Sequence, residues 1–146
     1  MLVYIAAPLF SEAERLFNLR LREFVQKFGF STYLPQEDGG LYSELIKQGE
    51  PEDKVSRKLF TLDYENVEDC DVLVAVLDGR TVDEGVSFEL GAAYALGKRR
   101  IGFKTDSRSC ELGKDNLMIE QALERIARNW NELEQYLVEC LARAHS

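Results

Sequence analysis

The sequence predicts an α/β fold in which helices cover both faces of a parallel sheet of four to five strands. Two observations predict it: short apolar runs rich in β-branched residues alternate with longer segments of helical period, and the run "VLVAVL" is apolar throughout. Such a strand is buried on both faces, and right-handed crossovers between parallel strands place helices there. We therefore expect a single-domain, doubly wound sheet of the Rossmann or flavodoxin type over residues 1–146.

The predicted strands are apolar segments bounded by polar residues. Four are well marked, at residues 2–6, 30–34, 71–77 and 100–104, and a short fifth is expected at 125–129. In such a sheet, ligands bind beyond the carboxyl ends of the strands. The segments expected there are 7–10, 35–40, 78–85 and 105–116.

The helical segments carry recognisable start signals. Ser11 and Glu14 have the spacing of a capping box in the segment 11–28, and Pro51 stands near the start of the segment 50–69. Two further helices are expected after the fourth strand, at 116–124 and at 131–144, the second capped by Asn129 or Asn131.

Length and charge limit the kinds of partner. The chain has 146 residues, of which 45% are hydrophobic, enough for one substantial core. Its formal net charge of −8 argues against a nucleic-acid polymer, because phosphate contacts need clustered lysine and arginine, so we expect small-molecule partners. The start of the chain lacks a basic leader and no apolar run approaches the ~18 residues of a membrane span, so no membrane partner is expected.

The cysteine and histidine residues disfavour several kinds of site. Cys70, Cys110 and Cys140 form no CxxC pair and are odd in number, so neither a zinc cage nor a disulfide framework is indicated, and a reducing cytoplasm is the expected compartment. The only histidine, His145, is the penultimate residue, where a frayed tail is expected. Histidine-based catalysis and most zinc sites are therefore improbable. No metal or organic cofactor is indicated, and carboxylate chemistry remains.

Glu89 lies in "DEGVSFELGAAYALGKRR", where a carboxylate is unexpected. If a helix begins near residues 83–85, the neighbours of Glu89 at three and four positions are small or apolar, and none is a cation: they are Gly85, Val86, Ala92 and Ala93. A charge on the helix face that packs against the sheet is costly unless the helix amino terminus or a hydroxyl donor compensates it. We interpret Glu89 as a functional carboxylate, with a hydrogen-bonded structural glutamate as the alternative.

Three other residues are candidates for the same crevice. Tyr4, on the first strand, is the candidate donor to Glu89, because its ring suits a core and its hydroxyl needs a partner. Asp83 lies at a strand-to-helix turn, where a simple N-cap is the alternative, and Asp63 lies late in a helix, where a solvated acid is the alternative. Neighbouring carboxylates can have their pKa values pushed apart into an ionised nucleophile and a protonated acid, which suits cleavage of a glycosidic bond.

Four segments, in this order, resemble the nucleoside 2-deoxyribosyltransferase family. They are "YIAAPLF" from Tyr4, "LDYENVEDCDVLVAVLDG" (62–79), "VDEGVSFELGAAYALGK" (82–98) and "DNLM" (115–118). The resemblance implies a transferase of nucleotide salvage that moves the 2-deoxyribosyl group between nucleobases through a covalent glycosyl ester. Two successive inversions at the anomeric carbon then retain its configuration.

The resemblance also implies roles for the candidate residues. Glu89 matches the family's nucleophile, and Tyr4 matches a tyrosine that orients it. Asp63 and Asp83 match positions that bind the nucleobase and manage its proton. All four are therefore expected to be catalytic.

Substrate-binding residues are expected on other segments. Asn116 and Met118 match residues that reach the deoxyribose from a neighbouring chain, which implies a homo-oligomer, commonly a dimer-based hexamer. The alternatives are a helix N-cap for Asn116 and ordinary core for Met118. Phe10 and Gly85 are added because they lie in segments that follow the carboxyl ends of strands.

Two other functions remain open. A 2′-deoxynucleoside 5′-monophosphate N-glycosidase needs a phosphate cradle, but the loop "APLFSEAER" carries two glutamates that repel phosphate, although Ser11 and Arg15 suit it. A catalytically silent nucleoside-binding domain is the other alternative. Glu84 and Val86 stand where family members often carry small or hydroxyl residues, so the choice between purine and pyrimidine also stays open.

Overall fold

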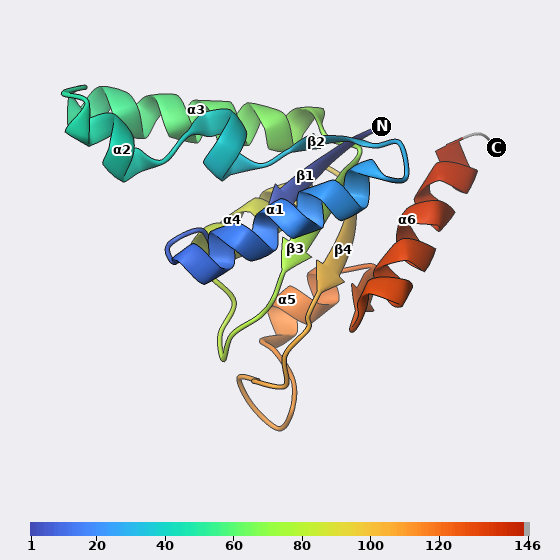
Figure 1. Ribbon diagram of the computed structural model, residues 1–146. Helices are drawn as coiled ribbons and strands as arrows, with labels where there is room; N and C mark the ends of the chain where they lie inside the picture. Colours follow the sequence, from blue (N-terminus) through green and yellow to red (C-terminus); the bar gives the residue numbers. More distant parts are fainter. Residues whose placement is uncertain (145–146) are drawn as a thin grey trace.

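A computed structural model describes residues 1–144 and contains the predicted parallel sheet (Figure 1). The strands lie in the order β2-β1-β3-β4-β5, and each neighbouring pair is parallel. They are β1 (Leu2–Ala6), β2 (Ser31–Tyr33), β3 (Val72–Val76), β4 (Arg99–Phe103) and β5 (Arg125–Ala127). The expected fifth strand is therefore present, and the strand order is that of flavodoxin-like folds. His145 lies outside the described residues.

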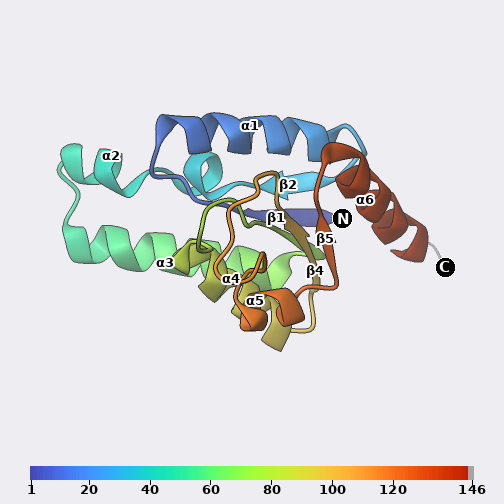
Figure 2. The same cartoon turned by 90° about the horizontal axis from the view of Figure 1, so that it is seen from below.

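Helices cover both faces of this sheet, which confirms the doubly wound architecture. Within residues 1–144 they are α1 (Glu12–Gln26), α2 (Tyr42–Lys47), α3 (Glu52–Asp69), α4 (Glu84–Ala95), α5 (Leu117–Ala122) and α6 (Trp130–Ala144). Figure 2 shows α1 and α6 on one side of the sheet and α3, α4 and α5 on the other. None of the helices in this part of the chain combines the length and apolar character that crossing a membrane requires.

Each face of the sheet has its own apolar core. Along β1, Val3 and Ile5 belong to the core under α1 and α6, whereas Tyr4 and Ala6 belong to the core under α3 and α4. This alternation follows from the pleat of a strand. Every residue of β3 is buried, which explains why "VLVAVL" is apolar throughout.

The predicted helix starts agree with the structure. The Ser11 hydroxyl accepts a bond from the Glu14 N–H at 3.2 Å, and the Glu14 carboxylate accepts from the Ser11 N–H at 2.7 Å, as in a capping box. Before α6 it is Asn129, and not Asn131, that accepts from the Glu132 N–H, at 2.9 Å. Local side chains therefore fix where these two helices begin.

The sequence pattern does not predict two elements between β2 and α3. Pro35–Gly39 forms a π-helical segment, η1, and the short helix α2 follows it. The Asp38 carboxylate accepts a bond from the Leu34 N–H at 2.7 Å and so closes η1 locally. Proline and glycine here indicate an irregular loop, but tertiary packing makes the segment a fixed turn beyond the carboxyl end of β2.

Candidate active site

The candidate active site includes β1, the strand at which the strand order reverses. The chain goes from β1 to β2 on one side of it and then returns to β3 on the other side. Tyr4 lies in the middle of β1, is fully buried, and donates its hydroxyl to Glu89 Oε1 at 2.7 Å. Glu89 lies in the middle of α4, on the side of the helix that also carries the buried residues Val86 and Ala93. The structure thus joins a strand and a helix through one hydroxyl–carboxylate bond.

No cation neutralises Glu89, because the ion pairs found within residues 1–144 do not include it. Burial raises the pKa of Glu89 to about 8; the bond from Tyr4 opposes this rise, and the charges of Asp63 and Asp83 add to it. Burial, followed by the charge of Glu89, raises the pKa of Tyr4 far above its ordinary value. Tyr4 therefore remains a hydrogen-bond donor throughout the physiological pH range.

Asp83 is the N-cap of α4, so its N-cap alternative is confirmed. Its Oδ1 accepts bonds from the N–H groups of Gly85 at 2.9 Å and of Val86 at 3.0 Å. A Cβ on Gly85 would lie 3.1 Å from Asp83 Oδ1, so glycine permits this close approach. The first-turn N–H groups thus bind Asp83 and not Glu89, which corrects the expectation that the helix amino terminus could compensate Glu89. The hydroxyl of Tyr4 is the compensating donor.

Asp63 lies on α3 and is half-buried, so the solvated-acid alternative is wrong. The Tyr33 hydroxyl donates to Asp63 Oδ1 at 2.8 Å, and the Tyr33 ring stacks on Tyr4 with the ring centroids 5.3 Å apart. Burial raises the pKa of Asp63, and the bond from Tyr33 lowers it. Sequence reasoning missed Tyr33, although the same argument applied to Tyr4, a tyrosine in an apolar strand, could have found it.

A cavity of about 270 Å³ between α3 and α4 is lined by the carboxylates of Asp63 and Glu89. Its lining residues are Phe60, Asp63, Tyr64, Val67, Gly85, Phe88, Glu89 and Ala92. The Phe60 ring lies 5.9 Å from that of Tyr64 and 6.0 Å from that of Phe88, measured between centroids. Sequence reasoning missed this aromatic wall, for which the four-residue spacing of Phe60 and Tyr64 was the available signal. Aromatic walls beside polar groups suit a flat organic ring.

Three predicted substrate-binding residues do not line this cavity. Phe10 is 77% exposed on the loop after β1, and Met118 is 72% exposed near the start of α5. Asn116 is the N-cap of α5, since its Oδ1 accepts from the Met118 N–H at 2.9 Å. The N-cap alternative for Asn116 is therefore confirmed, and the core alternative for Met118 is wrong. Of the predicted substrate-binding residues, Gly85 alone lies in the cavity wall of the described chain.

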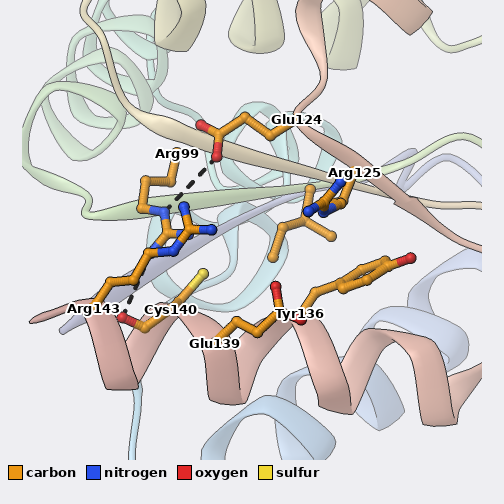
Figure 3. A pocket seen from close by; sticks show the side chains of 8 residues that line it. Arg99, Glu124, Arg125, Tyr136, Glu139, Cys140 and Arg143 are labelled. Atoms are coloured by element: carbon orange, nitrogen blue, oxygen red, sulfur yellow. Dashed lines mark hydrogen bonds and ion pairs between the residues drawn. The ribbon is translucent and has the colours of Figure 1, made fainter.

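A second cavity, of about 290 Å³, lies between the starts of β4 and β5 and the end of α6, away from these carboxylates (Figure 3). Three of its eight lining residues are arginines, and two of these contact protein groups. Arg99 lies 3.9 Å from Glu124 and donates to the Cys140 carbonyl at 3.5 Å, and Arg125 lies over the Tyr136 ring at 5.9 Å. The cavity between α3 and α4, where carboxylates have no cation, is therefore the candidate active site.

Within residues 1–144, no group of three or more His, Cys, Asp or Glu side chains is arranged to hold a metal ion. The carboxylates of the site are instead held by tyrosine hydroxyls and backbone N–H groups. Such an arrangement suits proton transfer and nucleophilic attack by carboxylates themselves.

The family model described as nucleoside 2-deoxyribosyltransferase matches residues 3–128. The chain belongs to the nucleoside 2-deoxyribosyltransferase family. This match confirms the resemblance seen in the sequence, and it spans β1, α3 and α4, which carry the candidate active site. No curated protein sequence matches the chain.

Solved structures agree with this membership. A conserved protein from Enterococcus faecalis V583 is 28% identical, with a TM-score of 0.76 and 98% of each chain covered. A 2-deoxyribosyltransferase from Bacillus psychrosaccharolyticus is 25% identical, with a TM-score of 0.73 over 92% of this chain and 90% of the other. A CMP N-glycosidase from Clostridium botulinum is 20% identical, with a TM-score of 0.60 over 94% of this chain and 98% of the other, and shares the fold.

Proposed function

We propose that the protein is a nucleoside deoxyribosyltransferase of nucleotide salvage, with Glu89 as its nucleophile. The observation that carries this proposal is the Glu89 carboxylate, held 2.7 Å from the Tyr4 hydroxyl and paired with no cation in residues 1–144. A carboxylate with a strongly raised pKa in a cavity is a candidate for chemistry, because a structural one is normally neutralised by a partner. All three cysteines are free thiols, which suits a reducing cytoplasm as the proposed compartment.

The reaction proceeds in two displacements at the anomeric carbon. In the first, a Glu89 oxygen attacks C1′ of a 2′-deoxynucleoside, the C1′–N bond breaks with its electron pair going to the base, and Asp63 gives the departing base a proton. In the second, the new base attacks C1′, the ester bond to Glu89 breaks, and Asp63 takes a proton from that base. Each displacement inverts C1′, so the configuration is retained overall.

The two roles require opposite ionisation states of the two carboxylates. Attack requires an ionised Glu89, and proton donation requires a protonated Asp63. Burial raises the pKa of both groups, to about 8 for Glu89, and each is bonded by its own tyrosine. With a pKa of about 8, Glu89 holds the proton at neutral pH in the free protein, so the reactive state, with Glu89 ionised and Asp63 protonated, requires that proton to pass from Glu89 to Asp63.

The start of α5 supplies the proposed contact with a second copy of the chain. Leu117 and Met118 are 70% and 72% exposed, and Phe60 and Phe88 are 57% and 56% exposed beside the cavity. Large apolar groups in water mark an interaction surface. We place Asn116 and Met118 of one copy against the deoxyribose bound in another, in a homo-oligomer such as a dimer or a hexamer. Light scattering should find an oligomer, and Met118→Glu should weaken both assembly and activity.

Hydrolysis of a nucleotide is the second candidate function, which the shared fold with a CMP N-glycosidase and the presence of Ser11 and Arg15 favour. The bonds at the start of α1 oppose it. One oxygen of Glu14 already accepts from the N–H groups of Phe10 at 2.9 Å and Ser11 at 2.7 Å, and Arg15 donates to the Leu9 carbonyl at 3.0 Å. The backbone N–H groups of Phe10 and Ser11 and one N–H of Arg15 are thus already bonded within the protein, and the Glu14 carboxylate among them repels a phosphate.

Base exchange tests the proposed function. Purified protein given deoxyinosine and free adenine should form deoxyadenosine and hypoxanthine, and Glu89→Gln should abolish this while a matched change of the exposed Glu134→Gln should not. Deoxynucleoside monophosphates without an acceptor base should remain intact. Release of free base and deoxyribose 5-phosphate would support hydrolysis instead. Binding without turnover, detected as a nucleoside-dependent rise in Tm, would identify a silent binding domain.

A further inference from the structure

Tyr33 is the second tyrosine of the site, and its hydroxyl bonds Asp63 as the hydroxyl of Tyr4 bonds Glu89. Its side chain is almost fully buried, with 6% exposed, and its hydroxyl donates to Asp63 Oδ1 at 2.8 Å. Asp63 also lines the cavity beside Glu89. Tyr33 therefore occupies one oxygen of Asp63 and leaves the other for a bound nucleobase.

Packing on two sides fixes this hydroxyl–carboxylate pair. On one side, the Tyr33 ring stacks on Tyr4, and the two residues are register partners in the sheet. On the other, η1 closes over the pair: a Cβ on Gly39 would lie 3.1 Å from the Tyr33 hydroxyl and 3.4 Å from Asp63 Oδ1. Three elements, β2, η1 and α3, thus meet at one hydrogen bond. Such convergence gives the hydroxyl and the carboxylate one relative orientation.

The groups that face the pair are mostly acidic. Burial, the bond to Asp63 and the charges of Asp63, Asp38 and Glu89 all raise the pKa of Tyr33, so its hydroxyl keeps its proton. Asp38 itself is paired with Arg22 on α1 at 3.3 Å. For Asp63, burial opposes ionisation, and the Tyr33 bond is the interaction that favours it.

We propose that Tyr33 is a positioning residue that holds Asp63 in the orientation and ionisation needed to exchange a proton with the nucleobase, a role that rests on the proposed deoxyribosyl transfer. When Asp63 gives its proton to the departing base, the carboxylate that remains is stabilised by the Tyr33 hydroxyl. When the next base arrives, Asp63 takes a proton back, and the Tyr33 proton never leaves its oxygen. Asp63 thus loses one proton in the first displacement and regains one in the second, so it ends in the state in which it began.

A double-mutant cycle on base exchange tests this role with Tyr33→Phe, Asp63→Asn and the combination of both. Tyr33→Phe should lower kcat about tenfold with KM nearly unchanged, the size expected for a lost bond to a charged group. It should also raise the apparent pKa that Asp63 contributes to the pH profile of kcat/KM by about one pH unit. Added to Asp63→Asn, it should cause no further loss. Tyr136→Phe, which removes a hydroxyl on α6, is the control and should leave activity unchanged.

Two results would overturn the role of Tyr33. One is a double variant whose loss of kcat is the product of the losses in the two single variants; the other is a pH profile of kcat/KM that is the same in Tyr33→Phe as in the wild type. The phenylalanine ring preserves the stack on Tyr4, so the variant should fold, which its Tm checks. If the wild-type protein exchanges no base, the proposed function fails on its own. In that case the pKa of Asp63, measured from its carboxyl ¹³C chemical shift, still tests the bond between Tyr33 and Asp63. A higher pKa in Tyr33→Phe than in the wild type supports the bond, and an unchanged pKa overturns it.

Discussion

Asp115 and Glu89 are both carboxylates set into the protein, and the chain treats them in opposite ways. Asp115 accepts a bond from the Lys104 ammonium at 2.7 Å, and the two side chains expose only 2% and 3% of their surface. Glu89 receives a bond of the same length, 2.7 Å, from the neutral hydroxyl of Tyr4. Asp115 is therefore paired with a cation, whereas the bond to Glu89 comes from an uncharged donor.

The surroundings of each carboxylate explain the difference. Lys104 also lies 3.4 Å from the Leu77 carbonyl and 3.5 Å from the Gly79 carbonyl, so its ammonium joins the segments that follow β3 and β4. That pair is a clamp between loops. Glu89 lies at a cavity, where a lysine would neutralise the oxygen that attacks the sugar in the proposed reaction. The carboxylate that is paired with a cation thus joins two loops, whereas the carboxylate without a cation is the proposed nucleophile.

Lys104→Met should have the largest effect on stability, because it leaves the Asp115 charge buried without a partner. We expect the free energy of unfolding, measured by urea denaturation, to fall by about 3–5 kcal/mol. Adding Asp115→Leu should recover most of this loss, since the pair is then replaced by apolar groups. A loss below about 1 kcal/mol, typical of an exposed ion pair, would contradict the clamp.

Glu89→Gln should show the opposite behaviour, because Glu89 opposes folding once it is ionised. Its pKa is raised from 4.5 to about 8, so the folded state holds a proton that the unfolded state releases, and wild-type stability should fall as the pH rises through this window. Each pKa unit corresponds to about 1.4 kcal/mol, and solvent in the cavity reduces the total to about 2–3 kcal/mol. Glu89→Gln should lose this slope and exceed the wild type in stability at pH 8.

The exposed Glu134 provides the control for that experiment. Glu134→Gln should retain the dependence of unfolding free energy on pH that Glu89 produces, because this variant leaves Glu89 and its surroundings unchanged. Equal slopes for wild type and Glu89→Gln would contradict the raised pKa of Glu89 in the folded state.

Tyr4→Phe should reduce kcat/KM about tenfold at pH 7 through loss of the one bond that favours ionised Glu89. The pKa of Glu89 should then rise above about 8, so part of the activity should return at higher pH. The pH profile of kcat/KM measures both effects. Unchanged activity at pH 7 would mean that Tyr4 does not hold the nucleophile.

Asp83 should show the smallest effect on stability. Asp83→Ala should lose about 1 kcal/mol of unfolding free energy, as an N-cap does, whereas Asp83→Asn should keep the cap and remove the charge. Because the charge of Asp83 raises the pKa of Glu89, Asp83→Asn should shift the titration of Glu89 downward. The same stability for both variants would argue against the cap.

The fold and the central carboxylate could be predicted because both depend on local pattern. The apolar run of β3 identifies a strand buried on both faces, and the residues around Glu89 show the absence of a cation one turn away in either direction. The N-cap roles of Asp83 and Asn116 are likewise set within a few residues. Such signals lie within one helix or one strand and survive in the sequence alone.

The missed features depend on contacts between distant segments. The bond between Tyr33 and Asp63 requires β2 to lie beside β1 and α3 to cross it, and 30 positions separate the two residues. The wall formed by Phe60 and Phe88 requires α3 and α4 to pack together. The apolar character of Met118 suits a core as well as a surface, so the sequence does not reveal that α5 presents this side chain to solvent.

The most direct test of the central claim is to trap the intermediate. The protein should be mixed with deoxyinosine in the absence of an acceptor base, quenched in acid, digested and analysed by mass spectrometry. We predict that the peptide containing Glu89 gains the mass of one 2-deoxyribosyl group, and that adding adenine before the quench removes it. Base exchange with no adduct on that peptide, or with the adduct on another carboxylate, would contradict the assignment of Glu89 as the nucleophile.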